Sequence, residues 1–455
     1  MADLTVSETI FALSSGKGRA GVSVIRLSGP ETGRAILALT NKEKRPVPRE
    51  THLCWFRDPN TGIRLDQGLL IYFAAPNSFT GEDVAEFHIH GGRAVVSGFL
   101  DALSSIKGLR SALPGEFTRR AFDNGKMDLT AAEGLADLIN SETEAQRRQA
   151  LRLMDGRLGD LYEEWRKEII TAQAYLELDI DFSDEEIPQD VTLKVRPIIE
   201  GLLDKITRHL GEGIKGERIR DGLQVVIMGA PNIGKSTLLN FLSKRDVAIV
   251  SHIAGTTRDL LEVHLDIAGF PVTVVDTAGI RESQDVIEAE GIRRAEHRAK
   301  DADIKILMID AGDWPEIPER LKKHMGQNAI ILLNKSDLLP KGDQINIQDE
   351  HDCLGVFPIS VSRETGMADF LACLTETAES YMELTDGPNL TRTRHREALA
   401  NCVTHLNRFC DYPDKELVLL AEDLRMAARS LGSITGRVDV EDMLDMIFSE
   451  FCIGK

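Results

Sequence analysis

Residues 225–236 constrain the fold of this chain more than any other stretch. A short apolar run leads into a loop framed by Gly229 and Gly234, and Lys235 and Ser236 then open a helical pattern. This order is typical of a phosphate-binding loop, because glycines let successive backbone N–H groups turn into one hollow. We expect Lys235 to neutralise the β and γ phosphates of a nucleotide and Ser236 to bind Mg²⁺.

Three further motifs follow in the order that a guanine-nucleotide domain needs. Residues 255–259 (GTTRD) carry Thr257, whose hydroxyl can complete the Mg²⁺ shell only when the γ phosphate is present, so this segment is expected to be a switch. Residues 276–279 (DTAG) place a carboxylate near the metal and a glycine N–H near the γ phosphate. Residues 334–337 (NKSD) are expected to bind guanine, since a carboxylate can accept hydrogen bonds from both N1–H and the 2-amino group. Ser362 is expected to contact the guanine oxygen through its backbone, although the following residues differ from the usual Ser-Ala-Lys.

From residue 223 to about 382 strand patterns alternate with helical ones, which predicts a doubly wound sheet with the nucleotide at the carboxyl ends of its strands. The predicted strands are 225–228, 261–267, 272–275, 304–309, 330–333 and 357–360. The residues predicted to bind GTP are Asn232, Ile233, Gly234, Lys235, Ser236, Thr237, Ser251, His252, Ile253, Ala254, Gly255, Thr256, Thr257, Asp276, Thr277, Ala278, Gly279, Asn334, Lys335, Ser336, Asp337 and Ser362.

The hydrolytic machinery is less clear from the residues, because Ile280 stands where Ras-like enzymes carry the glutamine that orients water. Asn232, together with backbone carbonyls from residues 251–256, could bind a monovalent cation where an arginine finger would otherwise place positive charge. Three carboxylates after the second switch are able to activate or position water: Glu282, Glu288 and Glu290. The pattern does not separate these three, and an exposed helical position is the alternative for each.

The regions on either side of this domain have different patterns. Residues 1–124 mix strands (22–27 and 68–73) with a helix (94–103), which predicts an α+β domain. From 129 to 178 the pattern is helical, with an apolar seam formed by Leu151, Met154, Leu158, Leu161 and Trp165. Helix resumes at 193–210 and is predicted to stop at the glycines of 211–216. Amphipathic helices at 398–406, 417–431 and 443–448 predict one helical domain that is interrupted by the nucleotide domain.

Composition limits the partners and the compartment. The net charge of −19 repels nucleic acid in general, so an RNA contact would need a local basic patch. The best candidate is Arg392, Arg394, His395 and Arg396, with a solvated helix start as the alternative. Six scattered cysteines indicate a reducing compartment, and the sequence shows neither a targeting segment nor an apolar run near 18 residues. We therefore expect a cytoplasmic protein with no membrane span.

Along essentially its whole length the chain resembles the bacterial tRNA-modification GTPases called MnmE or TrmE. The resemblance depends on residues 76–83 (PNSFTGED), 114–122 (PGEFTRRAF), 124–129 (NGKMDL), the nucleotide motifs and the ending 452–455 (CIGK). It implies a P-loop GTPase domain inserted into an all-α helical domain, preceded by an α+β domain that dimerises and binds tetrahydrofolate. The implied domains are 1–124 (folate), 125–217 (helical, first part), 218–382 (GTPase) and 383–455 (helical, second part).

The same resemblance implies roles for particular residues. Arg26, Glu82, Lys126 and Lys455 match folate-contacting positions; Asn232, Ser251, Ile253 and Thr256 match a potassium site; Ser236 and Thr257 match the Mg²⁺ site; and Glu288 and Cys452 match catalytic positions. Members of the family work with the flavoprotein MnmG (GidA). Together they attach an aminomethyl or carboxymethylaminomethyl group to C5 of the wobble uridine of certain tRNAs, with a 5,10-methylene- or 5-formyl-type tetrahydrofolate as one-carbon source. Ser14-Ser15 departs from the Thr-Pro of many relatives.

Two other functions are compatible with the nucleotide motifs. A regulatory GTPase of ribosome assembly would share the nucleotide domain but would need neither a folate site nor Cys452. The other is a folate-dependent one-carbon enzyme that GTP merely regulates.

Overall fold

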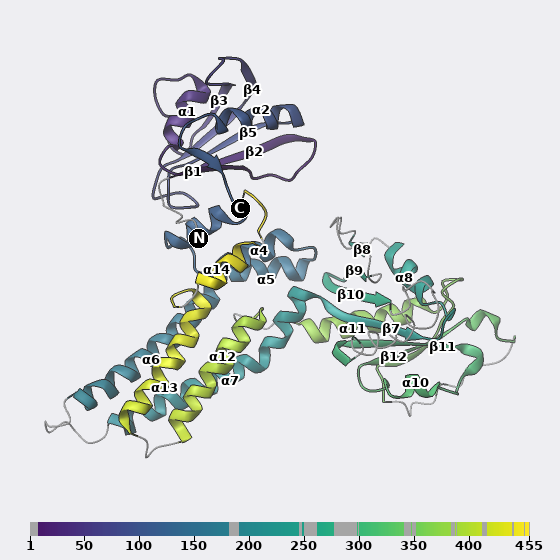
Figure 1. Ribbon diagram of the computed structural model, residues 1–455. Coiled ribbons are helices and arrows are strands. Elements are labelled where there is room, and N and C mark those ends of the chain that lie inside the picture. The colour runs from purple at the N-terminus through teal and green to yellow at the C-terminus, as the bar shows by residue number, and fades with distance from the viewer. Residues whose placement is uncertain are drawn as a thin grey trace, which may run out of the picture. The chain divides into compact units, whose positions relative to one another are not determined.

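The computed structural model describes residues 8–181, 191–244, 248–249, 262–276, 298, 300–340, 347, 352–383, 387, 389–411, 416–438, 441–449 and 451–454 (Figure 1). These residues form two compact units, one within 1–136, 153–167 and 428–455, the other within 137–152 and 168–427. Among the described residues, no helix combines the length and the apolar character needed to cross a bilayer.

The amino-terminal part of the first unit is a six-stranded sheet with two helices on one face (Figure 1). Its elements are β1 (Thr9–Leu13), β2 (Ala20–Ser28), α1 (Thr32–Thr40), β3 (Thr51–Arg57), β4 (Arg64–Phe73), β5 (Val84–Gly91), α2 (Arg93–Ser104) and β6 (Leu109–Ser111). The strand order is β3-β4-β5-β2-β1-β6, antiparallel except for the parallel pair β1–β6. Alternate strand residues such as Phe56 and Phe87 pack with α1 and with Phe99 of α2, and this cluster forms the core. The predicted α+β elements in this region are confirmed.

The first unit also contains the carboxyl end of the chain. Helices α3 (Glu116–Asp123) and α4 (Leu129–Asn140) follow the sheet, and α14 (Glu441–Ser449) packs against α3. Leu129 and Leu135 share an apolar cluster with Phe448 and Phe451. This cluster fixes the last helix beside the segment that follows the sheet.

The predicted apolar seam from Leu151 to Trp165 is wrong in its first half. The helix breaks between α5 (Glu144–Met154) and α6 (Arg157–Asp181), where Gly156 has a φ of 76°. Leu151 and Met154 are 38% and 37% exposed, whereas Trp165 is buried. The break changes the helical register. Apolar residues spaced three and four apart on its two sides therefore do not lie on one face of a single helix.

The predicted helix stop at residues 211–216 is also wrong. Helix α7 (Val191–Asp221) continues through these glycines. A Cβ on Gly213 would lie 3.1 Å from the Leu390 side chain, and a Cβ on Gly216 would overlap the Leu390 carbonyl. These glycines permit close packing of the chain that enters α12 (Thr393–Asp411), and Arg196 of α7 donates to the Cys410 carbonyl at 2.8 Å. Helices from the two sides of the nucleotide domain therefore pack together, as in Figure 1, where α7 lies beside α12.

Two glycines of α7 give a matched test of this packing. Gly216→Ala is expected to lower the free energy of unfolding by about 2 kcal/mol or more, because its methyl group would overlap backbone. Gly211→Ala is expected to raise that free energy by up to about 1 kcal/mol, because a Cβ there meets nothing within 4 Å and alanine is the better helix former. Chemical denaturation of both variants checks the difference. Equal effects would refute the close approach at Leu390.

The nucleotide domain is a seven-stranded sheet of order β13-β12-β11-β7-β10-β9-β8, in which β9 and β8 are antiparallel to their neighbours and the other strands are parallel. Its elements are β7 (Leu223–Gly229), α8 (Lys235–Lys244), β8 (Ala248–Ile249), β9 (Glu262–Ile267), β10 (Phe270–Asp276), β11 (Ile304–Asp310), η1 (Ala311–Asp313), α10 (Glu319–Lys322), β12 (Ala329–Asn334), η2 (Ser336–Leu338), β13 (Gly355–Pro358) and α11 (Met367–Met382). One apolar cluster joins the sheet to α8 and α11, and a second cluster on the opposite face includes Leu321 of α10. The predicted strands are confirmed, although β13 begins and ends two residues earlier than predicted, and residue 261 of the predicted strand 261–267 lies outside the described residues.

The remaining helix, α13 (Leu417–Thr435), follows α12. Together with α12 and α14 it confirms the three amphipathic helices predicted after the nucleotide domain.

Candidate functional site

The phosphate loop joins β7 to α8, so its backbone N–H groups gather at the amino end of a helix. Asn232 and Gly234 have φ values of 59° and 107°, which lie in the region that glycine tolerates best. The Lys235 ammonium donates to the Gly229 and Ala230 carbonyls at 3.0 and 2.9 Å. The lysine side chain is thereby folded over the loop, with Ser236 and Thr237 in the first turn of the helix.

Asn334 ties the phosphate loop to the predicted base-binding segments. Its side-chain N–H₂ donates to the Ile233 carbonyl at 2.7 Å, and its side-chain oxygen accepts from the Val361 N–H at 3.1 Å. The side chain is buried, so both bonds form away from water. The Asn334 side-chain amide therefore fixes the distance between the phosphate loop and the segment predicted to bind the base.

The residues after Asn334 continue this arrangement. Lys335 pairs with Asp310 at 2.8 Å, and the Ser336 N–H donates to the Ile359 carbonyl at 3.1 Å. Burial raises the pKa of the Asp310 carboxyl, but the bonds from Lys335 and from the Gly312 N–H outweigh it, so this pKa lies below its ordinary value. Asp337 follows on η2, and its partly exposed carboxylate is available to a base.

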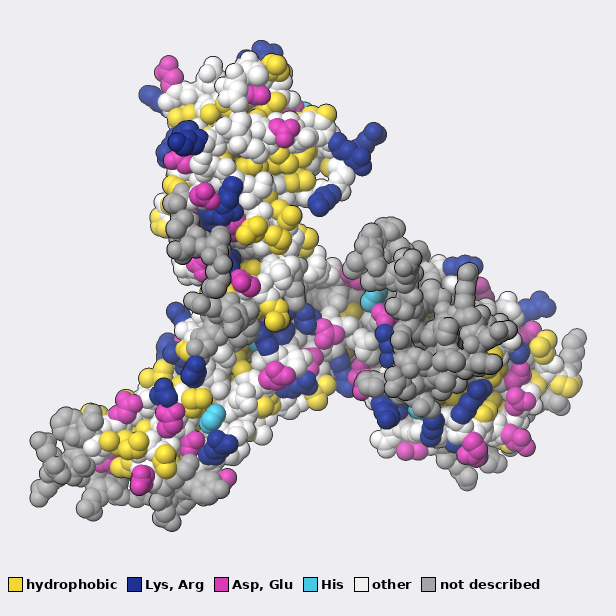
Figure 2. Space-filling view, viewed as in Figure 1, with side chains coloured by type: hydrophobic (Ala, Val, Ile, Leu, Met, Phe, Trp, Pro, Cys, Tyr) yellow, Lys and Arg dark blue, Asp and Glu magenta, His cyan; other side chains and the backbone are white. Residues whose placement is uncertain are grey.

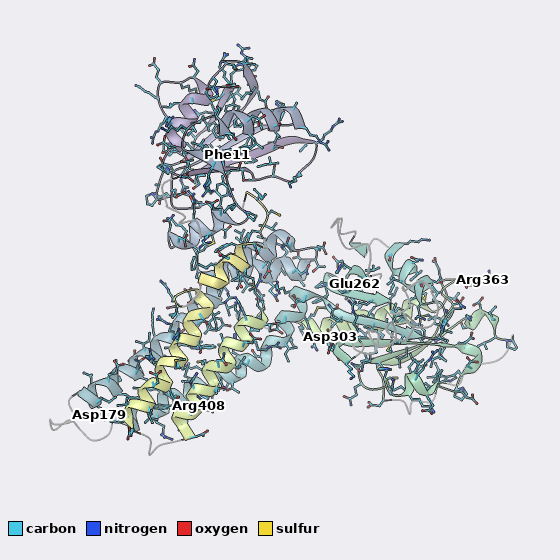
Figure 3. All side chains as sticks on the ribbon, in the orientation of Figure 1. Phe11, Asp179, Glu262, Asp303, Arg363 and Arg408 are labelled. Carbon is cyan, nitrogen blue, oxygen red and sulfur yellow. The ribbon has the colours of Figure 1, made fainter. Side chains whose placement is uncertain are left out.

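Ser362 lies in a tight turn next to Asp337. Reciprocal backbone bonds of 3.0 and 3.1 Å close the turn between Ser360 and Thr365, and Glu364 takes a left-handed φ of 56°. Arg363 (labelled in Figure 3) points its Nε to within 3.9 Å of the Asp337 carboxylate. Sequence reasoning missed Val361, whose N–H meets Asn334, and the buried Ser360 that comes soon after β13. A serine at the end of the predicted strand 357–360 is the sequence signal that could have indicated them.

The other predicted nucleotide-site residues are only partly described. The backbone of Asp276 ends β10 and pairs with Ile227 of β7, so it lies at the carboxyl edge that carries the phosphate loop. The predicted residues that lie outside the described part of the chain are Ser251, His252, Ile253, Ala254, Gly255, Thr256, Thr257, Thr277, Ala278, Gly279 and Glu288.

A second group of predicted site residues lies around residues 79–82 of the first unit. Arg26 of β2 pairs with Glu86 at 2.8 Å, and its guanidinium lies 5.3 Å from the ring centre of Phe79. A Cβ on Gly81 would lie 3.1 Å from the Lys126 side chain, so the absence of a side chain there leaves room for the lysine. Glu82 follows directly in the same loop. The structure thus brings three of the four predicted folate residues together, while Lys455 lies outside the described residues.

Glu82 belongs to a network of charged side chains that is largely buried. Arg120 donates to its two oxygens at 3.2 and 3.0 Å, and the Ser28 hydroxyl donates to it at 2.6 Å. Arg120 also pairs with Glu116 at 3.1 Å. Burial raises the pKa of Glu116, but hydrogen bonds from Arg110 and the Leu113 N–H and the charges of both arginines lower it below its ordinary value. The network fixes the orientation of the Glu82 carboxylate.

The predicted basic patch at residues 392–396 is wrong. Arg392 is 8% exposed and pairs with Asp137 at 2.7 Å, and His395 is fully buried. Arg396 pairs with Glu217 at 3.2 Å. On the face shown in Figure 2, Lys and Arg side chains over the helices lie among Asp and Glu side chains. Positive charge near the start of α12 therefore balances carboxylates within the protein.

A strand, a glycine-framed loop, a helix, and an Asn-Lys-x-Asp segment held to that loop define a P-loop domain specific for guanine nucleotides. Two family models match the chain: the GTP-binding protein TrmE N-terminus over residues 9–126, and the MnmE helical domain over residues 129–452.

Curated relatives match over the full length. The tRNA modification GTPase MnmE of Parvibaculum lavamentivorans is 53% identical over 453 residues, covering 98% of this chain and 100% of that protein. The protein of the same name from Paramagnetospirillum magneticum is 49% identical and covers 99% of this chain and 100% of its own. The mitochondrial 5-taurinomethyluridine-[tRNA] synthase subunit GTPB3 of Danio rerio is 46% identical, with 98% of this chain and 93% of that protein covered. This chain belongs to the MnmE family of tRNA modification GTPases.

Proposed function

We propose that this chain hydrolyses GTP to drive the modification of tRNA. With an MnmG-type flavoprotein it installs an aminomethyl or carboxymethylaminomethyl group at C5 of the wobble uridine, and a tetrahydrofolate supplies the one-carbon unit. The observation that carries this proposal is that likeness to tRNA modification GTPases extends over the amino-terminal domain and the carboxyl end as well as the nucleotide domain. A ribosome-assembly GTPase would have no need of those parts.

Nucleoside analysis of tRNA from a strain that lacks the gene tests this proposal. Wobble uridines should lose their C5 group in that strain and regain it when the chain is restored. Unchanged wobble uridines would remove the proposal and favour the ribosome-assembly function. Persistence of the group when GTP hydrolysis alone is blocked would favour a one-carbon enzyme that GTP only regulates.

The residues around 79–82 suit a tetrahydrofolate. Arg26 offers a guanidinium beside the partly buried ring of Phe79, and Glu82 offers a fixed carboxylate, so the site combines an aromatic ring with both signs of charge. We propose that Arg26, Glu82, Lys126 and Lys455 hold the folate, which supplies an activated one-carbon unit when bound. The protein groups bind and orient that ligand.

In the nucleotide domain we propose that Ser236 and Thr257 hold Mg²⁺. The loop 251–257 then orders only around the γ phosphate and the cation, and hydrolysis releases it. This cycle would close and reopen a pair of nucleotide domains in a cytoplasmic homodimer. GTP turnover would thus drive motion, while the uridine chemistry would occur at the proposed folate site of the amino-terminal domain.

Hydrolysis is expected to be at least about tenfold faster in K⁺ than in Na⁺, because a cation of the right size would stabilise the negative charge that develops on the transferred phosphoryl group. We propose Asn232, Ser251, Ile253 and Thr256 as its ligands; Asn232 lies in the phosphate loop between β7 and α8. Phosphate release in matched chloride salts measures the ratio. Equal rates in the two salts would refute the cation site, and Asn232→Ala should abolish the preference for K⁺.

Glu288 is proposed to position the attacking water. Glu288→Ala should keep GTP affinity and lower turnover by about 100-fold, because it removes a group used only in the transition state. The neighbouring carboxylates Glu282 and Glu290 give matched controls, and their alanine variants should hydrolyse GTP normally. Normal turnover in Glu288→Ala would withdraw the assignment.

A further inference from the structure

The last described residues, 451–454, are held against the amino-terminal domain; we call them the tail. Phe451 is buried in the cluster that contains Phe448 and Leu129. Ile453 forms an antiparallel bridge with Pro114, and the Ser14 hydroxyl donates to the Gly454 carbonyl at 2.8 Å. This bond joins residues 440 positions apart in the sequence. The tail is therefore docked at both of its ends.

Two glycines make this docking possible. Gly454 has a φ of 102°, and a Cβ there would overlap the Leu13 carbonyl and lie 3.0 Å from the Ser14 Cα. Gly115 has a φ of 67°, and a Cβ there would overlap the Phe448 carbonyl. At both points backbone lies directly against backbone, so a larger residue requires one chain to move away.

The docking point adjoins the strand that carries Arg26. Ala12 of β1 pairs with Arg26 of β2, and the Ser14 N–H, at the end of β1, donates to the Val24 carbonyl at 2.8 Å. Ser14 thus continues the β1–β2 ladder with its N–H and holds the tail with its hydroxyl. Cys452, between the buried Phe451 and the bridged Ile453, is exposed.

We propose that Ser14 and Gly454 are positioning residues for tRNA modification, which hold the tail on the end of β1 so that Cys452 stays beside the β1–β2 pair. The proposal rests on the proposed function, because Cys452 enters tRNA modification only as a catalytic position that the family resemblance implies. The hydroxyl of the neighbouring Ser15 does not bind the tail but accepts a hydrogen bond from the Val24 N–H at 3.1 Å.

The test uses the full-length protein and four variants. Ser14→Ala removes the hydroxyl, Ser14→Thr keeps it, and Gly454→Ala forces the backbone apart. Ser104→Ala is the matched control, because that exposed hydroxyl bonds only within its own helix. Hydrogen exchange of the carboxyl-terminal peptide measures docking, and modified uridine formed per tRNA measures function, with GTP hydrolysis as the basal activity.

Exchange in the tail should rise about fivefold in Ser14→Ala and more in Gly454→Ala, with Ser14→Thr and Ser104→Ala like wild type. Uridine modification should fall in the same order, while GTP hydrolysis stays unchanged. Unchanged exchange in Ser14→Ala would overturn the docking role, and faster exchange with full modification would overturn the positioning role. If wild type itself modifies no uridine, the proposed function fails, and the exchange data still decide whether Ser14 docks the tail.

Discussion

Asp337→Asn is expected to turn this GTPase into a xanthosine-triphosphate-dependent enzyme. The carboxylate can accept hydrogen bonds from guanine N1–H and the 2-amino group, whereas an amide offers one acceptor and one N–H₂ donor. Loss of charge-assisted bonds worth about 1.5–3 kcal/mol each should weaken GTP binding by about 100-fold or more. Xanthine carries a carbonyl where guanine has the amine, so the new amide donor should restore binding of that nucleotide.

Binding of both nucleotides by titration calorimetry checks this reversal. Asp313→Asn is a suitable control, because this exposed carboxylate lies on η1 of the same domain. The control should bind GTP like wild type. If Asp337→Asn bound GTP as tightly as wild type, a group other than the Asp337 carboxylate would accept the hydrogen bonds from guanine.

Gly234→Ala is expected to weaken GTP binding strongly. Gly234 has a φ of 107°, and a Cβ there would lie 2.5 Å from the Asn334 side-chain nitrogen. The substitution adds backbone strain of about 1–3 kcal/mol and breaks the bond from Asn334 to Ile233, worth about another 1 kcal/mol. The affinity for GTP should therefore fall by about 100-fold or more, because the damage lies at the phosphates.

Gly201→Ala serves as the control for this change, since a Cβ on that residue of α7 meets nothing within 4 Å. It should bind GTP normally. Fluorescence titration with a labelled GTP analogue measures both variants. A Gly234→Ala protein that retained wild-type affinity would contradict the close contact between the phosphate loop and Asn334.

Features that depend on neighbouring residues could be predicted from the sequence. The phosphate loop is such a feature, because the residues that shape it, such as Gly234 and Lys235, all lie in one short segment between a strand and a helix. The strands predicted from apolar runs bounded by turns, two in the first sheet and six in the second, lie at or close to the predicted positions, whereas β1, β3, β6 and β8 were not predicted. Glu82 and Lys126 were identified by resemblance alone, and the structure adds the Arg120 pair that fixes the first of them.

Features that depend on distant contacts could not be predicted. Gly216 resembles a helix terminator in sequence, but its lack of a side chain accommodates Leu390 from the other side of the nucleotide domain. The local sequence around Arg392 is typical of an exposed basic patch, but in the structure Arg392 pairs with Asp137, a residue far away in the sequence. The bond from Ser14 to Gly454 crosses nearly the whole chain. In each case the partner that decides the role of the residue is remote, and local periodicity carries no information about it.

The central claim is that GTP turnover drives tRNA modification, and reconstitution with purified components measures this most directly. The full-length chain, an MnmG-type flavoprotein, a tetrahydrofolate and unmodified tRNA are combined with GTP or with a non-hydrolysable analogue, and the modified wobble uridine is quantified. The account predicts modified uridine with GTP and little or none with the analogue. Equal product with the analogue, or with no nucleotide, would contradict it.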